Sequence, residues 1–269
     1  MCLIAFAFDP DAQQKLFVLA NRDEFYGRAA KKAGFWEDIP GVLAGRDLEA
    51  GGTWLGVHTS GRFAAVTNYR EPGRQVEDAL TRGDLVTGFL KGSLSSEAYL
   101  NEIESESHRY NGFNLIVYDG ENLGYFSNKS SEGPVLLTKG IFGLSNHLLD
   151  TPWPKVVRAK QGMKTLLDSF PDAHSIWTDM SAMHLFEDPT QAADGALPST
   201  GVSLDLERTL SAMLIKSPNY GTRCTTMVGL WQDGRIRFAE KTLHPKGLDP
   251  AMLPFEIQPG FNAAPDLEF

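Results

Sequence analysis

The sequence predicts an α+β fold in which stacked antiparallel sheets are flanked by layers of helices. Apolar runs of strand length come in pairs joined by turn residues, and helical periodicity appears in groups between those pairs. Single strands do not alternate with single helices, as they would in a chain of parallel βαβ units. No shift in composition marks a boundary, so residues 1–269 are expected to form a single domain.

Four hairpins are predicted along the chain. The first joins the apolar run 2–8 to the run 15–20, with Asp9-Pro10-Asp11 between them. The other three turn at Ser-Gly or Asp-Gly pairs, which are strong short-range hairpin signals: Ser60-Gly61, Asp119-Gly120 and Asp233-Gly234.

Apolar residues at helical spacing predict four helices between the hairpins, near residues 85–90, 98–103, 156–170 and 206–214. Pro152 and Pro154 stand just ahead of the third helix, where helix starts tolerate proline. Residues 188–201 are expected to form a long loop, and the proline-rich tail after Pro245 to wrap the surface.

Composition excludes several classes of protein. The 25 Lys and Arg against 34 Asp and Glu give a net charge of −9, which disfavours nucleic-acid binding and a polybasic membrane anchor. No apolar run approaches the roughly 20 residues that span a bilayer, so no membrane insertion is expected. The first residues carry no basic leader, and the chain has only two cysteines, so a reducing cytoplasm is the expected compartment.

Metal and nucleotide sites lack support as well. No His-Glu-x-x-His, Cys-x-x-Cys or Gly-x-x-x-x-Gly-Lys motif occurs, and the six histidines show no metal spacing. We therefore expect no metal and no cofactor. The expected partner is a small-molecule substrate or ligand, and the oligomeric state is not readable from the sequence.

Cys2 is the residue that most directly suggests chemistry. Removal of Met1, which peptidases carry out when the next side chain is small, would leave Cys2 with both a thiol and a free α-amine. The thiolate is a strong nucleophile, and an α-amine with a reference pKa near 8 can act as its base. The alternative is that Cys2 is a small apolar residue that opens a buried strand.

Five polar residues near the ends of predicted strands suit such a nucleophile. Arg22 and Asp23, expected in a turn after the second strand, can stabilise a thiolate and orient the amine. Asn68 and Asn146 follow short apolar runs, where a side-chain amide can donate to an oxyanion. Arg223, at the start of the last hairpin, can reach a carboxylate or a thiolate. Each of these alone is more often a surface or turn residue.

Three further residues lie near these motifs and can wall a substrate pocket: Trp54, Tyr69 and His147. Aromatic residues at such positions are equally typical of a core. Cys224 is most simply interpreted as a buried apolar residue. A disulfide between Cys224 and Cys2 would leave Cys2 without a free thiol and so inactivate the nucleophile. Gly51-Gly52 is interpreted as a turn that enters a strand.

Taken together, the motifs resemble those of the Asn-Arg-Asp-Glu motif family, also called the transport and Golgi organisation protein 2 family. The resemblance covers nearly the whole chain and rests on Met1-Cys2, Asn21-Arg22-Asp23-Glu24, Gly51-Gly52-Thr53-Trp54-Leu55-Gly56, Thr67-Asn68-Tyr69-Arg70 and Tyr220-Gly221-Thr222-Arg223. That family is similar in pattern to the N-terminal-nucleophile hydrolases of the penicillin V acylase and bile salt hydrolase type.

The resemblance implies a four-layer αββα sandwich and a set of roles. Cys2 would be the nucleophile with its own α-amine as base, Arg22 would tune the thiol and Asp23 would hold the amine. The resemblance places Asn68 and Asn146 at or near an oxyanion hole, and Arg223 in the surrounding polar cage.

Two functions are consistent with these motifs. The first is an amidohydrolase that cleaves a linear, non-peptide carbon–nitrogen bond of a small acyl amide through an acyl thioester on Cys2. The alternative is a binding or trafficking protein without chemistry, which holds haem or a lipid or acyl-coenzyme A ligand on the same fold. Some eukaryotic members of the family point to this second class.

Overall fold

The computed structural model describes residues 2–74, 76–170, 176–177, 180–243 and 252–260 of the chain. Within this part of the chain the strands form two sheets, and neighbouring strands in both sheets pair antiparallel. The first sheet has the order β10 (Gly140–Leu144), β1 (Cys2–Phe8), β2 (Gln14–Phe25), β11 (Tyr220–Trp231), β12 (Ile236–Thr242) and β13 (Met252–Ile257).

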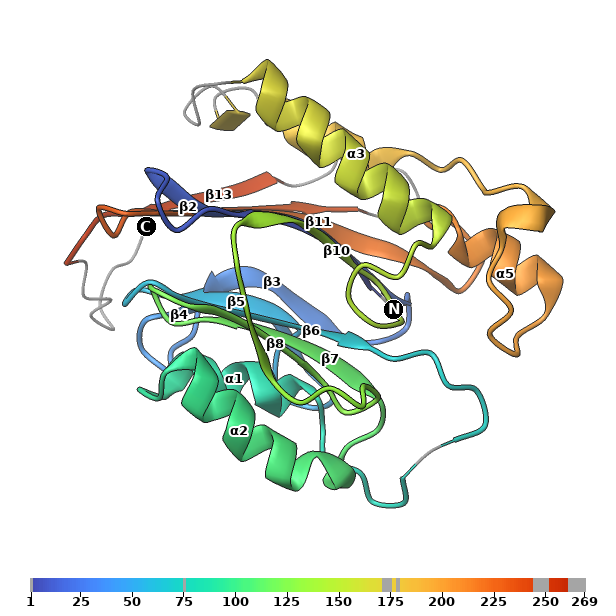
Figure 1. Ribbon diagram of the computed structural model, residues 1–269, viewed down its shortest axis with the longest axis horizontal. Helices are drawn as coiled ribbons and strands as arrows, with labels where there is room; N and C mark the ends of the chain where they lie inside the picture. The colour runs from blue at the N-terminus through green and yellow to red at the C-terminus, as the bar shows by residue number, and fades with distance from the viewer. Residues whose placement is uncertain (1, 75, 171–175, 178–179, 244–251, 261–269) are drawn as a thin grey trace.

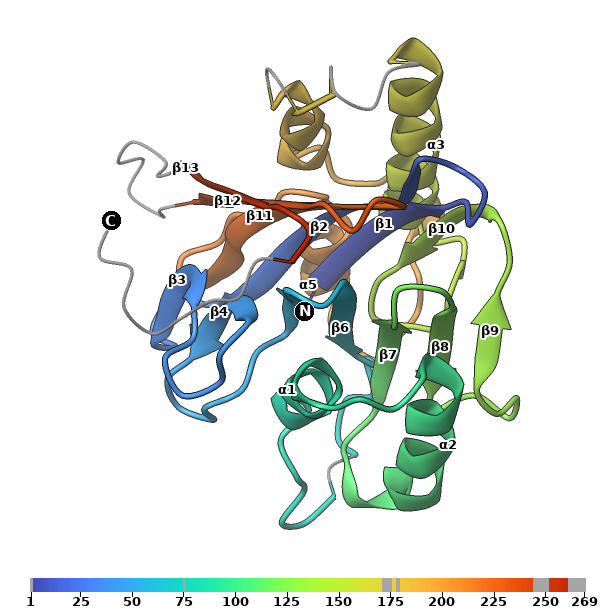
Figure 2. The ribbon, with the colours of Figure 1, turned by 90° about the vertical axis from the view of Figure 1, so that its left-hand side faces the viewer.

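The second sheet has seven strands in sequential order: β3 (Ala30–Phe35), β4 (Val42–Asp47), β5 (Leu55–His58), β6 (Arg62–Asn68), β7 (Phe113–Tyr118), β8 (Leu123–Ser127) and β9 (Val135–Leu137). The two sheets lie face to face, and helices cover their outer faces (Figures 1 and 2). The described α-helices are α1 (Gly83–Lys91), α2 (Ser96–Glu106), α3 (Pro154–Ser169) and α5 (Leu204–Leu210). Short 3-10 turns are η1 (Ser107–Arg109), η2 (Ser181–Glu187) and η3 (Asp194–Ala196).

Three hydrophobic clusters separate the four layers. Ile4 and Phe6 of β1 belong to the cluster between the two sheets, together with Val18 of β2. A second cluster joins the outer face of the six-stranded sheet to α3 and η2, and a third joins the seven-stranded sheet to α1 and α2. The structure therefore confirms the four-layer αββα sandwich.

Strand β1 shows why its sequence is apolar throughout. Its even-numbered residues face the other sheet, whereas Leu3 and Ala5 face α3. Because both faces of the strand are covered, side chains on both must be apolar, and the usual alternation of polar and apolar residues is lost. Neighbouring β2 is paired on both sides, with β1 and with β11.

Most of the predicted elements are present, and some differ. The four hairpins are confirmed, and Pro154 occupies the first turn of α3. Residues 21–24 lie inside β2 and do not form the predicted turn, because pairing with β11 continues as far as Phe25. The last predicted helix ends at Leu210.

The C-terminal part differs from the surface wrapping that we predicted. Met252–Ile257 forms strand β13, which pairs with β12 at the edge of the six-stranded sheet. Residues 244–251 and 261–269 of the same predicted tail lie outside the described residues. None of the described helices is both long enough and apolar enough to cross a bilayer.

Candidate active site

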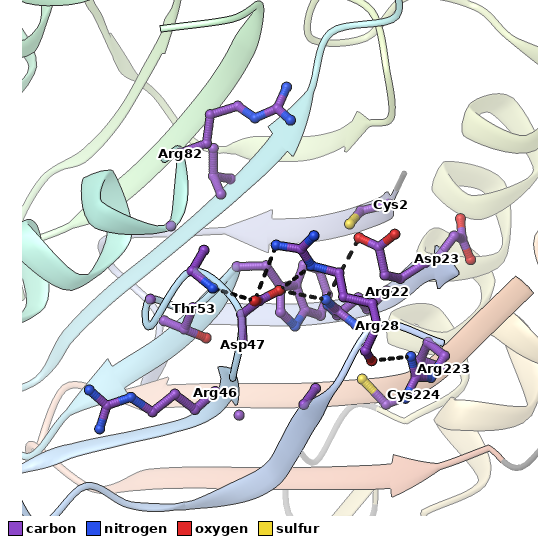
Figure 3. A pocket seen from close by; sticks show the side chains of 18 of the residues that line it. Cys2, Arg22, Asp23, Arg28, Arg46, Asp47, Thr53, Arg82, Arg223 and Cys224 are labelled. Atoms are coloured by element: carbon purple, nitrogen blue, oxygen red, sulfur yellow. Dashed lines mark hydrogen bonds and ion pairs between the residues drawn. The ribbon is translucent and has the colours of Figure 1, made fainter. Parts of the chain in front are cut away.

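The pairing of three strands places two thiols on either side of one arginine. Arg22 on β2 is the register partner of Cys2 on β1 and also of Cys224 on β11. Register partners in an antiparallel pair carry their side chains on the same face. All three side chains therefore project from the face of the sheet that meets the second sheet, and all three line one cavity (Figure 3).

The motif in β2 sends alternate side chains to opposite sides of the sheet. The Arg22 guanidinium lies 3.4 Å from the carboxylate of Asp47 at the end of β4, in the other sheet. The Asn21 side chain instead donates to the backbone carbonyls of Phe186 and Met213 in the helical layer, at 2.8 and 2.9 Å. Because side chains alternate along a strand, Asn21 faces the helical layer and Arg22 faces the second sheet.

The cavity has a volume of about 820 Å³, which suits a small molecule. Six of the residues singled out in the sequence line it: Cys2, Arg22, Asp23, Trp54, Asn68 and Arg223. They come from β1, β2, the turn before β5, the end of β6 and β11, so segments more than 200 residues apart in the chain meet here. Figure 3 shows the sulfur atoms of both cysteines near the basic side chains of the cavity.

Burial raises the pKa of the Cys2 thiol. The nearby Arg22 guanidinium and a hydrogen bond from the Asp23 backbone amide to the sulfur act in the opposite direction, but burial dominates. The thiol is therefore held mainly in its protonated form at neutral pH. A nucleophile in this state needs a base close by.

Asp23 has a buried carboxylate next to Cys2. Its Oδ1 accepts a hydrogen bond of 2.7 Å from the hydroxyl of Thr222. Burial raises the pKa of Asp23, while the positive charge of Lys155 and the Thr222 hydroxyl act against that rise. Asp23 thus faces the α3 side of the sheet, opposite to its neighbour Arg22.

Asn68 and Asn146 are in direct contact, but only Asn68 lines the cavity. The Asn146 side chain is fully buried and donates to the backbone carbonyl of Asn68 over 2.9 Å. Its neighbour Ser145 donates from its hydroxyl to the backbone carbonyl of Cys2 over 3.0 Å. The segment after β10 therefore ties the end of β6 to the first residue of β1.

Arg223 lines the cavity beside Cys224, at the bulge in β11. Its guanidinium donates to the backbone carbonyls of Phe25 and Arg28, at 2.8 and 3.0 Å. These bonds hold the end of β2 against the segment that leads into β3. Nη1 of Arg223 therefore donates to backbone carbonyls and not to the Cys2 thiol.

Tyr69 and His147 do not line this cavity. The Tyr69 hydroxyl lies 2.8 Å from Nε2 of His147, and the ring of His147 contacts Trp153. Arg70 stacks over the same Trp153 ring and pairs with Glu207 at 2.9 Å. These side chains form a separate aromatic and ionic cluster at the start of α3.

Several site residues were missed at the sequence level. Arg82, just before α1, lines the cavity, and its half-buried guanidinium is close enough to Cys2 for a charge interaction. Asp47 accepts hydrogen bonds from both Arg22 and Arg28. No motif marks these residues, since only the fold brings them to Cys2. Among the described residues, no three His, Cys, Asp or Glu side chains form a group that could hold a metal ion.

Comparison with known proteins identifies the family. The model of the family described as Transport and Golgi organisation 2 matches residues 1–245. The chain belongs to the Transport and Golgi organisation 2 family. A human homologue is 38% identical over 268 residues, which cover 92% of this chain and 95% of that protein. A mouse homologue is 36% identical over 261 residues, covering 90% and 93%.

Solved structures show what fold this Transport and Golgi organisation 2 family member has. Penicillin V acylase from Agrobacterium tumefaciens aligns over 94% of this chain and 86% of its own, with a TM-score of 0.50 and 12% identity. The fold is that of the N-terminal-nucleophile hydrolases, as the motifs had implied. At this level of identity the similarity is one of fold and does not extend to the reaction.

Proposed function

We propose that this chain, once Met1 is removed, is an N-terminal cysteine hydrolase. It would cleave a linear, non-peptide amide bond of a small acyl amide. The observation that carries the proposal is the position of Cys2: the thiol of the first strand opens on a cavity of about 820 Å³ that Asn68 and Arg22 also line. A buried, mainly protonated thiol beside its own α-amine suits a nucleophile with a built-in base.

The proposed reaction has two halves. The Cys2 amine takes the thiol proton, and the sulfur attacks the amide carbon to form a tetrahedral oxyanion. The side-chain amide of Asn68 is the proposed donor to that oxyanion. As the carbon–nitrogen bond breaks, the α-ammonium gives its proton to the leaving amine, and an acyl thioester remains on Cys2. Water, deprotonated by the same amine, then releases the carboxylic acid and the thiol.

The supporting residues have narrower roles in this proposal. Asp23 orients the amine, and Arg22 favours the thiolate as it forms. Asn146 acts on Asn68, because its side chain holds the Asn68 carbonyl. The mechanism needs a free thiol, so we propose a reducing compartment such as the cytoplasm. Both cysteines are free in the structure.

A panel of small acyl amides, followed by release of the acid and by intact mass, tests the proposal. The chain is prepared to begin at Cys2, and Cys2→Ala is compared with it. Cys224→Ala is the matched control, since it removes the other thiol of the same cavity. We expect an acyl adduct on Cys2 and a loss of turnover in Cys2→Ala alone. Undiminished turnover in Cys2→Ala, or no turnover of any amide by the native chain, would overturn the proposal.

A second candidate function is supported by the charge of the cavity wall. Seven basic residues line it against four acidic ones, although the whole chain is acidic. The basic residues are Arg22, Arg28, Lys31, Lys32, Arg46, Arg82 and Arg223, and the acidic ones are Asp23, whose carboxylate points away from the cavity, Glu24, Asp47 and Glu240. Such a wall favours a ligand with carboxylate or phosphate groups, as in haem or an acyl-coenzyme A.

In this second case the chain binds or carries the ligand without chemistry. Saturable binding of haem or acyl-coenzyme A would then weaken in Lys31→Glu/Lys32→Glu and stay unchanged in Cys2→Ala. Binding that depends on Cys2, or no saturable binding, would count against it.

A further inference from the structure

Lys155, the second residue of α3, carries a buried charge that the proposed reaction does not use. Its side chain is only 1% exposed, and within the described part of the chain its Nζ has no hydrogen-bond partner. Burying an ammonium costs several kcal/mol unless other charges compensate for it. The charged groups that offset this cost therefore indicate the role of Lys155.

The start of α3 lies against the first residues of the chain. Trp153 and Val156, on either side of Lys155, pack in one cluster with Leu3. Lys155 is thereby placed behind the start of β1, on the side of the sheet toward which Asp23 projects. Arg22 lies on the opposite side and interacts with Asp47.

Four charged or titratable groups act on Lys155: Cys2 of β1, Asp23 of β2, Arg70 after β6, and Arg158 of α3 itself. Arg70 is already paired with Glu207 of α5. Tyr220 of β11 faces Asp23 as well. The favourable charge interaction of Lys155 is therefore with Asp23.

We propose that Lys155 is a positioning residue whose ammonium keeps Asp23 ionised while disfavouring the protonated form of the Cys2 α-amine. The amine would then be free to take the thiol proton near neutral pH. This inference rests on the proposed function, because it assigns a role to the base of that reaction.

The physical reason is that the Asp23 carboxylate and the Lys155 ammonium have opposite effects on the pKa of the Cys2 amine. An ionised carboxylate beside an amine stabilises the ammonium form and makes the amine a poor base, so Asp23 alone would hinder the reaction. A second positive charge behind the carboxylate cancels that effect and leaves Asp23 able to accept a hydrogen bond from the amine. Burial raises the pKa of Asp23 and lowers the pKa of Lys155 to about 8, and the opposite charge of each group acts against the shift of the other.

The test measures the α-amine directly and needs no substrate. The full chain, prepared to begin at Cys2 and labelled with ¹³C-cysteine, has only two cysteines, and only Cys2 carries an amine. The Cα resonance of Cys2 is followed by NMR from pH 5 to 10. In Lys155→Met we expect the amine to titrate about one to two pH units higher than in the native chain.

Two further variants separate charge from structure. Lys155→Arg keeps the positive charge and should restore a titration near the native one. Lys164→Met removes an exposed charge from the same helix and should change nothing. An amine that titrates alike in Lys155→Met and Lys164→Met would overturn the inference.

If Lys155→Met does not fold, the titration of the α-amine in the native chain still tests the inference. Its amine should titrate no higher than that of the same chain in denaturant, and a value more than one unit higher would overturn the inference. The outcome is distinct from that of the proposed function. Turnover without any effect of Lys155 on the amine removes the inference alone. An unreactive Cys2 whose amine still responds to Lys155 removes the proposed function and leaves only the electrostatic effect of Lys155 on the amine.

Discussion

Cys2 and Cys224 lie two strands apart, one on each side of Arg22. Neighbouring strands are about 4.8 Å apart, so the two Cα atoms are separated by roughly 10 Å. A disulfide requires Cα atoms within about 7 Å of each other. The two thiols thus share a cavity but cannot bridge while β2 stays between them, and both are free in the structure.

We therefore expect no Cys2–Cys224 disulfide in the folded chain under mild oxidation. Intact-mass analysis after diamide treatment should show no loss of two hydrogens. The same chain unfolded in urea is the control, because β2 then no longer separates the two cysteines and the disulfide should form. Rapid bridging of the folded chain would mean that the strand order at this end of the sheet is wrong.

Ser145→Ala should lower the free energy of unfolding by about 1 kcal/mol, because the buried carbonyl of Cys2 loses its 3.0 Å hydrogen bond. Ser105→Ala is a suitable control. Ser105 also donates to a backbone carbonyl, that of Glu102, but on an exposed face of α2. Urea unfolding of both variants measures the difference, and equal losses would show that the bond to Cys2 contributes nothing specific.

The buried carboxyl of Glu240 should make the free energy of unfolding depend on pH. Burial raises its pKa above the ordinary value of 4.5, although hydrogen bonds from the Ala33 amide and the Cys224 thiol act against the rise. Its carboxyl is therefore more protonated in the folded chain than in the unfolded one. The associated stability is fully present below about pH 4.5 and is lost as pH rises through the raised value.

Glu240→Gln stays neutral and can still accept the bond from Ala33, which is 2.9 Å long in the native chain. The variant should gain stability relative to the native chain as pH increases from about 4 to 8, at about 1.4 kcal/mol for each unit by which the native pKa is raised. Urea unfolding at several pH values measures it. Glu256→Gln, on the exposed side of β13, is the control, and parallel curves for all three proteins would contradict the prediction.

Gly52 allows two backbone segments to approach each other beside the cavity. A Cβ at this position would lie 2.7 Å from the carbonyl carbon of Gly83, the first residue of α1. Gly52→Ala should therefore destabilise the fold by about 1–3 kcal/mol and shift Arg82, which precedes Gly83. Gly27→Ala, where a Cβ meets nothing within 4 Å, is the control. A thermal midpoint that is the same in both variants would contradict the prediction.

Local signals explain what the sequence could predict. The Asp-Gly and Ser-Gly turns and the fully apolar β1 need no knowledge of distant residues, so the hairpins and their order were predicted correctly. Strand β3 was missed because Ala30–Phe35 is mostly exposed and carries two lysines, and its pairing with β4 is interrupted by a bulge. Its strand character comes from its neighbour and not from its own pattern.

The candidate site was predictable only where a motif marks it. Cys2, Arg22 and Asp23 come together because β1 and β2 form a local hairpin with a short turn. Arg82 and Lys155 approach Cys2 from opposite sides of the sheet, one from a loop and the other from a helix far along the chain, and no spacing in the sequence signals that approach. Tyr69 and His147 stand near motifs in the sequence, yet they contact each other outside the cavity.

The opposite orientation of Arg22 and Asp23 also determines where this chain can change its length. The turn at residues 9–13 can grow or shrink without moving either side chain, since the strands on both sides keep their pairing. A single residue inserted between Gln14 and Asn21 would turn the guanidinium toward the helices and the carboxylate toward the opposite sheet. Homologous chains should therefore tolerate insertions in this turn and exclude them from the strand that follows.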